Sequence, residues 1–226
     1  MKEIISIQHI EKIYNPKKIP VHALQGVSVS IKQGEFTAIV GPSGSGKSTL
    51  LNLIGGLDTP TNGSVIINDT DIAKLTANQL IEFRLQHIGF VFQAYNLIPV
   101  LTSKENVEFI MLMQNRSKKE REERAISLLK AVGLEKEINR RPVELSGGQQ
   151  QRVAVARALA SKPAFVLADE PTANLDSKSA ENLLDIMERL NQEEGITFLF
   201  STHDARVVKR ARRVITLEDG QVVSDV

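Results

Sequence analysis

The sequence predicts an α/β fold into which a helical block is inserted, and three observations lead to this prediction. The β-rich run 36–40 ends in a glycine-rich loop, and a helical segment follows the loop. Between Gln93 and about Leu159 the pattern becomes helical, and from Phe165 onward buried strand runs and amphipathic helices alternate again. We therefore expect a single domain over 1–226, in which 1–92 and 161–226 form the α/β and β core and about 94–160 form the helical subdomain.

The first half of the chain contains the strands and helices that surround the loop. Residues 27–31 alternate between apolar and polar side chains like a half-buried strand. The segment 48–54 has no helix breaker before Gly55 and Gly56, which predicts a short helix that ends there. Further strands are expected at 65–67 and 88–92, and a further helix at about 77–86.

The second half contains two amphipathic helices and two strand signals. Ser117 and Glu120 form a capping box at the start of the first helix, and Gly133 ends it. The apolar stripes of the two helices are Ala125, Leu128, Leu129 and Val132, and Ala180, Leu183, Leu184 and Met187. A buried strand is expected at 197–200 and a terminal hairpin that turns at Asp219-Gly220.

Composition excludes several classes of protein. Hydrophobic residues make up 42% and charged residues 24%, as in ordinary globular domains, which argues against disorder and fibrous repeats. The 28 Lys and Arg residues balance 27 Asp and Glu residues, so no strong field favours nucleic acid as a partner. The absence of cysteine excludes a disulfide framework and cysteine-bound zinc.

No segment of the sequence predicts a membrane helix or a signal peptide. The most apolar stretch, 109–113, is far shorter than the ~18 residues that a membrane crossing needs. Charged and polar residues interrupt the N-terminus before a signal-peptide pattern can form. Any connection to a membrane is therefore expected to depend on a partner protein.

The loop from Gly41 to Ser48 fits the phosphate-binding pattern G-x-x-x-x-G-K-[ST]. Its glycines let successive backbone N–H groups converge on phosphate oxygens with no Cβ in the way. Lys47 is expected to reach the β- and γ-phosphates and Ser48 to bind Mg²⁺. The alternative, a turn that only joins strand to helix, is disfavoured because both elements lie where the motif requires them. The expected nucleotide-binding residues are Gly41, Pro42, Ser43, Gly44, Ser45, Gly46, Lys47, Ser48 and Thr49.

A second segment, 145–149, narrows the choice among the many phosphoryl-transfer families that share this loop. An alanine-rich stretch without helix breakers follows it, so Ser146 is expected to be the N-cap of a helix. With two glycines after Ser146, the helix start is a second place where backbone N–H groups can receive phosphate. Plain capping is the alternative when the segment is taken alone.

Residues 145–149 resemble the signature motif of the ABC ATPases, and the QQQRVAVARAL run that follows is similar to that family too. The resemblance covers nearly the whole chain. It implies a P-loop NTPase core with a mixed sheet, an N-terminal antiparallel β subdomain and an inserted α-helical signature subdomain. It also implies ATP hydrolysis by a head-to-tail homodimer or pseudo-dimer, in which one subunit's phosphate loop and the other's signature residues clamp one ATP. Those signature residues are Leu145, Ser146, Gly147, Gly148 and Gln149.

Two acids follow the buried strand run 165–168. Because adjacent residues at a strand end point in different directions, Asp169 and Glu170 can have different roles. The resemblance implies that Asp169 holds Mg²⁺ through water and that Glu170 is the general base for the attacking water. The alternative is that the acids only cap the turn before Pro171.

Gln93 and His203 complete the catalytic residues that the resemblance implies, together with Lys47 and Glu170. Gln93 matches the glutamine that contacts Mg²⁺ and the water, and His203 matches the histidine that contacts the γ-phosphate. Each alone would more often be a solvated or structural residue, and their positions after predicted strands support the functional interpretation. The expected Mg²⁺ ligands are Ser48, Gln93 and Asp169.

The resemblance also assigns a loop that crosses the dimer interface and an aromatic residue under the adenine ring. The loop is Ala173, Asn174, Leu175 and Asp176. Asp176 could instead be only the N-cap of the next helix. Tyr14 matches the aromatic residue, although a strand residue that fills the sheet edge is an equal alternative.

Several segments resemble the lipoprotein-releasing and macrolide-export branch of the family, among them 55–58, 88–93 and 96–107. The chain departs from the family at Ala173, where Gly is frequent, and at Tyr95, where many members carry Phe. The branch implies a separate membrane permease whose short coupling helix docks near 93–107. It also implies a peripheral location on the cytoplasmic face of the membrane, with room for a periplasmic or membrane-fusion partner.

Two other functions within the family are alternatives to transport. One is a regulatory ATPase, like the cell-division relatives that control a cell-wall hydrolase through a permease and transport nothing. The same motifs serve both roles. The other, a soluble ABC ATPase of DNA repair or translation, is disfavoured because the sequence has neither a long coiled coil nor a second ATPase unit.

Overall fold

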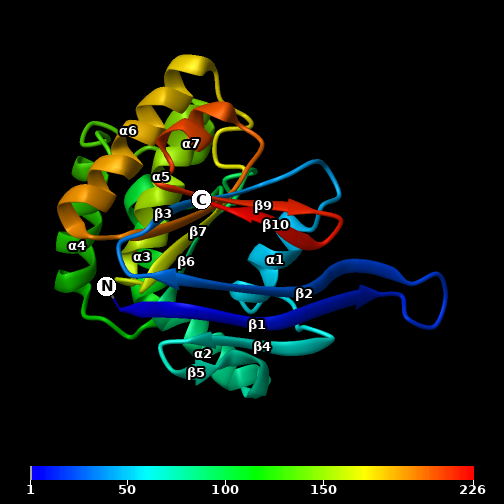
Figure 1. Cartoon of the computed structure of the whole chain (residues 1–226). Coiled ribbons are helices and arrows are strands. Elements are labelled where there is room, and N and C mark those ends of the chain that lie inside the picture. The colour runs from blue at the N-terminus through cyan, green and yellow to red at the C-terminus, as the bar shows by residue number, and fades with distance from the viewer. Residues whose placement is uncertain (1) are drawn as a thin grey trace.

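Two β-sheets and a set of helices form the structure, a computed structural model that describes residues 2–226 (Figure 1). The first sheet is antiparallel, with four strands in the order β2-β1-β4-β5. The second has six strands in the order β10-β9-β3-β8-β7-β6, of which β9 to β6 run parallel and β10 pairs antiparallel with β9. The strands are β1 (Glu3–Tyr14), β2 (Val21–Lys32), β3 (Phe36–Val40), β4 (Asn62–Ile67), β5 (Thr70–Asp71), β6 (Ile88–Val91), β7 (Phe165–Asp169), β8 (Thr197–Ser201), β9 (Arg213–Glu218) and β10 (Gln221–Asp225).

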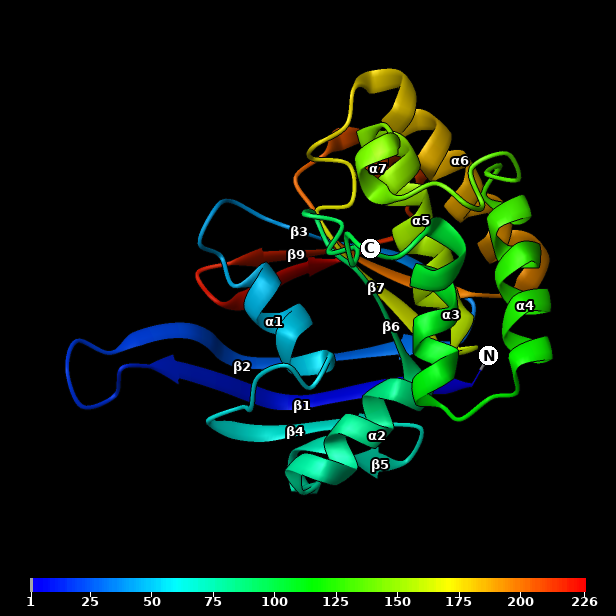
Figure 2. The ribbon, with the colours of Figure 1, turned by 180° about the vertical axis from the view of Figure 1, so that it is seen from behind.

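The helices divide between the two faces of the six-stranded sheet. They are α1 (Lys47–Ile54), α2 (Ala77–His87), α3 (Ser103–Met113), α4 (Lys118–Ala131), α5 (Gly147–Ala160), α6 (Ser177–Glu194) and α7 (Ala205–Arg210), with the short 3-10 helices η1 (Ile72–Lys74) and η2 (Pro142–Glu144). Helix α1 lies between the two sheets, whereas α3 to α6 lie on the opposite side of the large sheet (Figure 2). The predicted α/β fold, with a mixed sheet, an N-terminal antiparallel subdomain and inserted helices, is confirmed.

The central strands β7 and β8 are buried on both faces, as expected for parallel strands covered by helices. Successive residues contribute to different sides of the sheet. Leu167 and Leu199 pack with α1 and the antiparallel sheet, while Phe198 and Phe200 pack with the helices. The carboxyl ends of these strands are therefore held rigidly between two hydrophobic layers.

The inserted helices α3, α4 and α5 each begin at a capping box. Its members are Thr102 and Glu105, Ser117 and Glu120, and Ser146 and Gln149. Val107, Leu128 and Val153 belong to the same buried cluster as Phe200, so these helices share a core with the sheet. The boundaries of the helical subdomain, about 94–160, stay a prediction.

Strand β1 was not predicted, and its irregular backbone explains why. The pairing of β1 with β2 shifts register between Ile7 and Ile10, and His9 has a left-handed φ of 48°. This bulge interrupts the apolar and polar alternation that identifies a strand. The expected strand 27–31 is likewise only part of the longer β2.

The C-terminal hairpin is confirmed, with β9 and β10 joined at Asp219 and Gly220, both of which have positive φ. Over the residues that the structure describes, no helix has the length and apolarity needed to cross a membrane.

Candidate functional site

The phosphate loop joins the buried strand β3 to α1, and its backbone shape requires glycine. Gly46 is the N-cap of α1 in a left-handed conformation, with φ of 100° and no side-chain cap. A Cβ at Gly46 would lie 2.5 Å from the Ala23 carbonyl oxygen, and one at Gly41 would lie 2.0 Å from the Leu217 carbonyl oxygen. Because no side chain caps α1, its first backbone N–H groups remain available to an anion.

Lys47 extends across this loop. Its ammonium group donates hydrogen bonds to the carbonyl oxygens of Gly41 and Pro42, each at 2.9 Å. The lysine is thus held beside the same backbone that would receive phosphate. A single positive charge next to the start of α1 adds to the favourable field for an anion.

The register of the large sheet brings three strand ends together. Ile39 on β3 pairs with Ser201 on β8, and Ser201 pairs with Asp169 on β7. The phosphate loop after β3, the acids at the end of β7 and His203 after β8 therefore meet at one edge of the sheet, where parallel sheets bind ligands. A cavity of about 660 Å³ opens there, lined by the loop, Gln93, Glu170, Ala173, His203 and residues 21–23.

Ser48 and Asp169 lie within hydrogen-bonding distance of each other at this edge. The Ser48 hydroxyl donates to Asp169 Oδ1 at 3.2 Å, so a hydroxyl and a carboxylate oxygen face the same point. Mg²⁺ takes oxygen ligands and is commonly held by one or two protein groups together with waters and phosphate. This oxygen pair fits Mg²⁺, and Gln93 adds an amide oxygen on the cavity wall. Among the described residues there is no cluster of three or more Asp, Glu, His or Cys that would form an all-protein metal site.

The Glu170 carboxylate is held at both oxygens. His203 Nδ1 lies 2.6 Å from Oε1, and the buried Thr202 hydroxyl donates to Oε2 at 3.2 Å. The backbone of Glu170 has a left-handed φ of 45°, and its N–H donates to the Ser201 carbonyl at 2.9 Å. A carboxylate with fixed geometry on the cavity wall is suited to accept a proton from a water molecule.

Asp204 fixes the loop that carries His203 to the segment that carries Glu170. Its carboxylate accepts from the Thr172 hydroxyl at 2.6 Å and from the Arg206 guanidinium at 2.7 Å. The Arg206 hydrogen bonds, aided by Thr172, outweigh burial and lower the pKa of Asp204 to about 2. Sequence reasoning missed Thr172, Thr202 and Asp204. The only signal for them was their position beside residues already assigned.

Gln93 is connected to the expected interface loop. The Asn174 side-chain amide donates to the Gln93 carbonyl at 3.0 Å, and the Tyr95 hydroxyl donates to the Asn174 carbonyl at 3.3 Å. Ala173 lines the cavity, and Leu175 packs against the core. Asp176 caps α6 by accepting from the Ser179 N–H at 3.0 Å, which agrees with the alternative interpretation of that residue.

The signature residues lie apart from the phosphate loop of the same chain. Ser146 and Gln149 bond to each other's backbone N–H groups and cap α5. A separate hollow of about 240 Å³ lies beside them, lined by Ser146, Gly148, Arg152, Lys178, Ser179 and Asn182. The starts of α1 and α5 in one chain therefore face different spaces.

Tyr14 ends β1 next to the cavity. Its ladder partner Val21 lines the cavity, whereas Tyr14 lies beside that lining. The phenol donates to Asp58 Oδ2 at 2.7 Å, and the Lys12 ammonium lies 4.8 Å from the centre of the ring. The ring is therefore fixed near the mouth of the site.

Comparison with known proteins connects this geometry to a family. Residues 24–173 match the family model described as ABC transporter. The chain is 46% identical over 222 residues to an uncharacterised ABC transporter ATP-binding protein of Thermotoga maritima, covering 98% of this chain and 94% of the relative. It is 47% identical over 223 residues to a similar protein of Methanocaldococcus jannaschii, covering 97% and 95%.

A third relative is longer. The chain is 46% identical over 222 residues to the macrolide export ATP-binding/permease protein MacB of Mannheimia succiniciproducens, covering 98% of this chain and 34% of that protein. Among solved structures, a dimeric ATP-binding cassette in a post-hydrolysis state, bound to ADP and Pi, matches with a TM-score of 0.90 and 45% identity. That match covers 99% of this chain and 98% of the other.

Proposed function

The chain belongs to the ABC transporter family as an ATP-binding subunit that hydrolyses ATP, and from this premise we propose that it drives a separate membrane permease of the lipoprotein-release or macrolide-export type. The observation that carries the catalytic part is that the phosphate loop with Ser48 and Glu170 lines one cavity, while Asp169 is hydrogen-bonded to Ser48. The 46% identity to a macrolide export ATP-binding/permease protein supports the transport type.

In the proposed mechanism, the triphosphate of ATP lies along the phosphate loop. Backbone N–H groups at the start of α1 and the Lys47 ammonium balance its negative charge. Lys47 would exchange its bonds to Gly41 and Pro42 for phosphate oxygens. Ser48, Asp169 and Gln93 would hold Mg²⁺, which, when bound, neutralises charge on the phosphate oxygens.

Glu170 acts as the general base in this proposal. It takes a proton from the water whose oxygen attacks the γ-phosphorus, while the bond from that phosphorus to the ADP oxygen breaks, releasing ADP and phosphate. Thr202 and His203 keep the carboxylate in one orientation. His203 is largely exposed toward the cavity, so its other ring nitrogen can contact the γ-phosphate.

A second copy of the chain is proposed to complete the site. Ser146 and Gly148 of the signature segment line a hollow separate from the cavity of their own chain, so they are available to the ATP of another subunit. The dimeric form of the similar cassette supports this arrangement. Hydrolysis per subunit is expected to fall when the protein is diluted below the dimerisation range. A rate per subunit that stays constant on such dilution would rule the shared site out.

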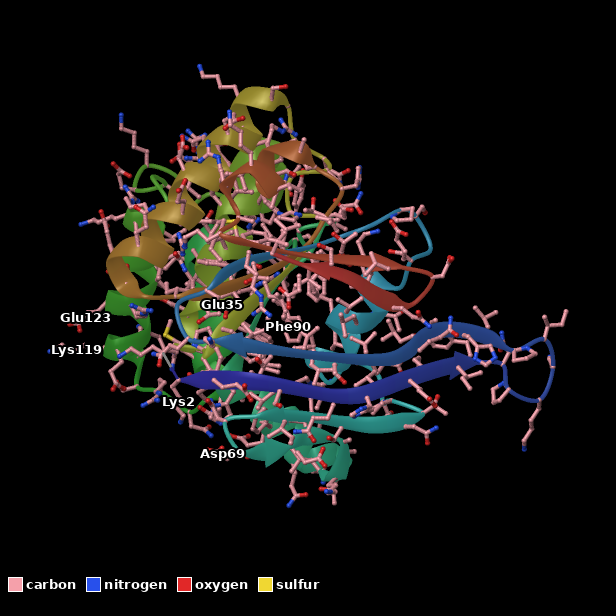
Figure 3. The ribbon with its side chains drawn as sticks, in the orientation of Figure 1. Lys2, Glu35, Asp69, Phe90, Lys119 and Glu123 are labelled. Atoms are coloured by element: carbon pink, nitrogen blue, oxygen red, sulfur yellow. The ribbon has the colours of Figure 1, made fainter. Side chains whose placement is uncertain are left out.

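The permease is proposed to dock into an apolar groove of about 640 Å³ between α2, β6, α3 and α5. Phe90 of β6, labelled in Figure 3, lies in its wall, and Ile81, Phe109 and Met113 are exposed at its rim. Exposed apolar residues grouped in a groove are typical of a site for a partner helix. The proposal places the subunit on the cytoplasmic face of the membrane through this contact.

The groove is linked to the catalytic edge by Arg157. Its guanidinium donates to the Tyr95 carbonyl at 2.9 Å and to the Asn96 carbonyl, in the segment that begins at Gln93. Arg157 also lines the groove, so movement of a docked helix would displace Arg157 and, through its hydrogen bonds, the segment that begins at Gln93.

Two measurements test the proposed function. Glu170→Gln is expected to retain ATP binding and to lower the turnover rate by ~10²–10⁴-fold, as for loss of a general base. Normal turnover in this variant would exclude Glu170 as the base.

Affinity purification from solubilised membranes is expected to recover an integral membrane protein in constant ratio to the chain. Recovery of the chain only from the soluble fraction would count against a permease partner.

A further inference from the structure

We propose that Asp58 and Lys12 are positioning residues that hold the Tyr14 ring as a preformed platform for the base of the bound nucleotide. The inference rests on the proposed function, in which the cavity binds ATP, and on the expectation from the sequence that Tyr14 lies under the adenine ring. It adds Lys12 and Asp58 as the two residues that determine the position and the mobility of that ring.

Lys12, Tyr14 and Asp58 form a cluster centred on Asp58, and both carboxylate oxygens of Asp58 accept hydrogen bonds. Oδ2 accepts from the Tyr14 hydroxyl at 2.7 Å, and Oδ1 accepts from the Lys12 ammonium at 2.6 Å. Oδ1 also accepts from the Thr59 N–H at 2.7 Å, and the Thr59 carbonyl accepts from Lys12 at 2.8 Å. The carboxylate therefore cannot rotate without losing several bonds, so the far end of the tyrosine is fixed.

Lys12 holds the ring in a second way. Its ammonium lies 4.8 Å from the ring centre, within the range of a cation–π contact. The Lys12 side chain is only 12% exposed, whereas Tyr14 is 36% exposed. With the cation against the ring and the hydroxyl fixed, the exposed part of the aromatic surface is what remains for a planar ligand.

The cluster also ties the platform to the phosphate loop. Lys12 and Tyr14 are two residues apart near the end of β1, while Asp58 follows α1, the helix that starts at the loop. The backbone N–H groups of Leu57 and Asp58 donate to the Asn52 carbonyl on α1, at 2.8 and 3.3 Å. The distance between the base platform and the phosphate site is therefore determined by one rigid connection through Asp58.

The electrostatics of the cluster keep the phenol protonated and the carboxylate charged. Burial and the hydrogen bond to Asp58 raise the pKa of Tyr14, with Thr49 in the first turn of α1 acting in the opposite direction. Burial acts to raise the pKa of Asp58, but hydrogen bonds from Lys12 and Tyr14 outweigh it and the pKa is lowered. A ring fixed in advance loses little freedom when the base stacks on it, which favours binding.

The experiment compares ATP with inorganic tripolyphosphate, which has no base, by calorimetric titration of the full chain. Asp58→Ala and Lys12→Met are each expected to weaken ATP binding by about 3- to 10-fold and to leave tripolyphosphate binding unchanged. Tyr14→Phe, which removes only the hydroxyl, is expected to match Asp58→Ala. Tyr14→Ala is expected to weaken ATP binding by about 10-fold or more, because the stacking surface is lost. Lys74→Met, which removes the exposed lysine of the Lys74–Asp71 pair, is the matched control and should bind both ligands normally.

A second experiment measures the pKa of the Tyr14 phenol directly. The chain has two tyrosines and no tryptophan, so in a Tyr95→Phe background the ultraviolet titration reports Tyr14 alone. Asp58→Asn and Asp58→Ala are expected to lower the pKa of Tyr14, because the neighbouring negative charge is removed.

The outcomes separate this inference from the function on which it rests. If the wild-type chain binds neither ATP nor tripolyphosphate, the proposed function fails. If Tyr14→Ala weakens ATP binding but Asp58→Ala, Asp58→Asn and Lys12→Met do not, the positioning role is overturned. Equal losses for ATP and tripolyphosphate in the Asp58 and Lys12 variants would also overturn it, because the cluster would then support the fold rather than the base.

Discussion

His203 Nδ1 lies 2.6 Å from Glu170 Oε1, and this contact connects the loop after β8 to the carboxylate that follows β7. The neighbouring Thr202 hydroxyl reaches the other oxygen of the same carboxylate at 3.2 Å. Two consecutive residues of one loop therefore determine the orientation of Glu170, and each can be tested separately.

His203→Ala is expected to lower kcat for ATP hydrolysis by about 10²-fold, because the γ-phosphate and Glu170 both lose a partner. The KM for ATP should change little, since the phosphate loop is intact. Phosphate release at saturating ATP measures the effect. The control is His9→Asn, which alters an exposed histidine in the β1 bulge while tolerating its left-handed backbone. An unchanged kcat in His203→Ala would remove His203 from the mechanism.

Thr202→Val keeps the shape of a buried side chain but removes the hydroxyl that holds Glu170. One lost hydrogen bond to a carboxylate should lower kcat by about 10-fold. The fold should be destabilised by about 1 kcal/mol, since the Asp204 N–H also loses its acceptor. Thr202→Ser restores the hydroxyl and is expected to recover most of the activity. If Val and Ser variants hydrolyse ATP equally, the hydroxyl has no positioning role.

Asp204 should make stability depend on pH in the acid range. Its pKa is lowered from 3.8 to about 2 in the folded chain, so the folded state favours the charged form. The resulting stabilisation, about 1–2 kcal/mol, is fully present above pH ~4 and is lost as the pH falls toward 2. Asp204→Asn should therefore unfold more easily than the wild type at pH 7, with a difference that shrinks between pH 4 and 2. Urea unfolding at several pH values measures it, and a difference that does not depend on pH would contradict this account.

Gly46→Ala should damage both stability and nucleotide binding. Its Cβ would meet the Ala23 carbonyl oxygen at 2.5 Å and Leu24 Cδ2 at 2.8 Å, at a backbone φ of 100°. The combined strain and overpacking are expected to destabilise the fold by about 2–4 kcal/mol. Gly34→Ala is the matched control, because Gly34 also has positive φ but an added Cβ has nothing within 4 Å. It should lose only about 1 kcal/mol and bind ATP normally. Thermal unfolding and ATP titration compare the two, and equal losses would show that crowding at Gly46 is unimportant.

Phe109→Asp and Met113→Asp place a charge on the rim of the apolar groove. Each is expected to reduce recovery of the permease at least 10-fold in pull-downs, because a partner helix would have to bury the charge. ATP hydrolysis by the isolated chain should stay at the wild-type rate. Val223→Asp, at an exposed apolar residue on β10, is the control and should retain the permease. Normal permease recovery with both groove variants would exclude this docking surface.

Local patterns were enough to predict most elements of the fold. The glycine loop between β3 and α1, the capping box at Ser117 and the turn at Asp219-Gly220 each depend on residues close together in sequence. Strand β1 escaped prediction because its bulge at His9 breaks the period of two. The roles of the candidate site residues stay predictions, and their positions at one sheet edge are what the structure adds.

By itself the sequence determined the α/β class, the glycine-rich loop before α1 and the capped start of α5, because backbone conformation, capping and apolar periodicity are local properties. Only the tertiary structure decided how Glu170 is held, since Thr202 and His203 come from the loop after a different strand, β8. The same is true of Asp58, which is 44 residues from Tyr14 in sequence. Hydrogen bonds between such distant residues depend on strand order and register, which no local pattern specifies.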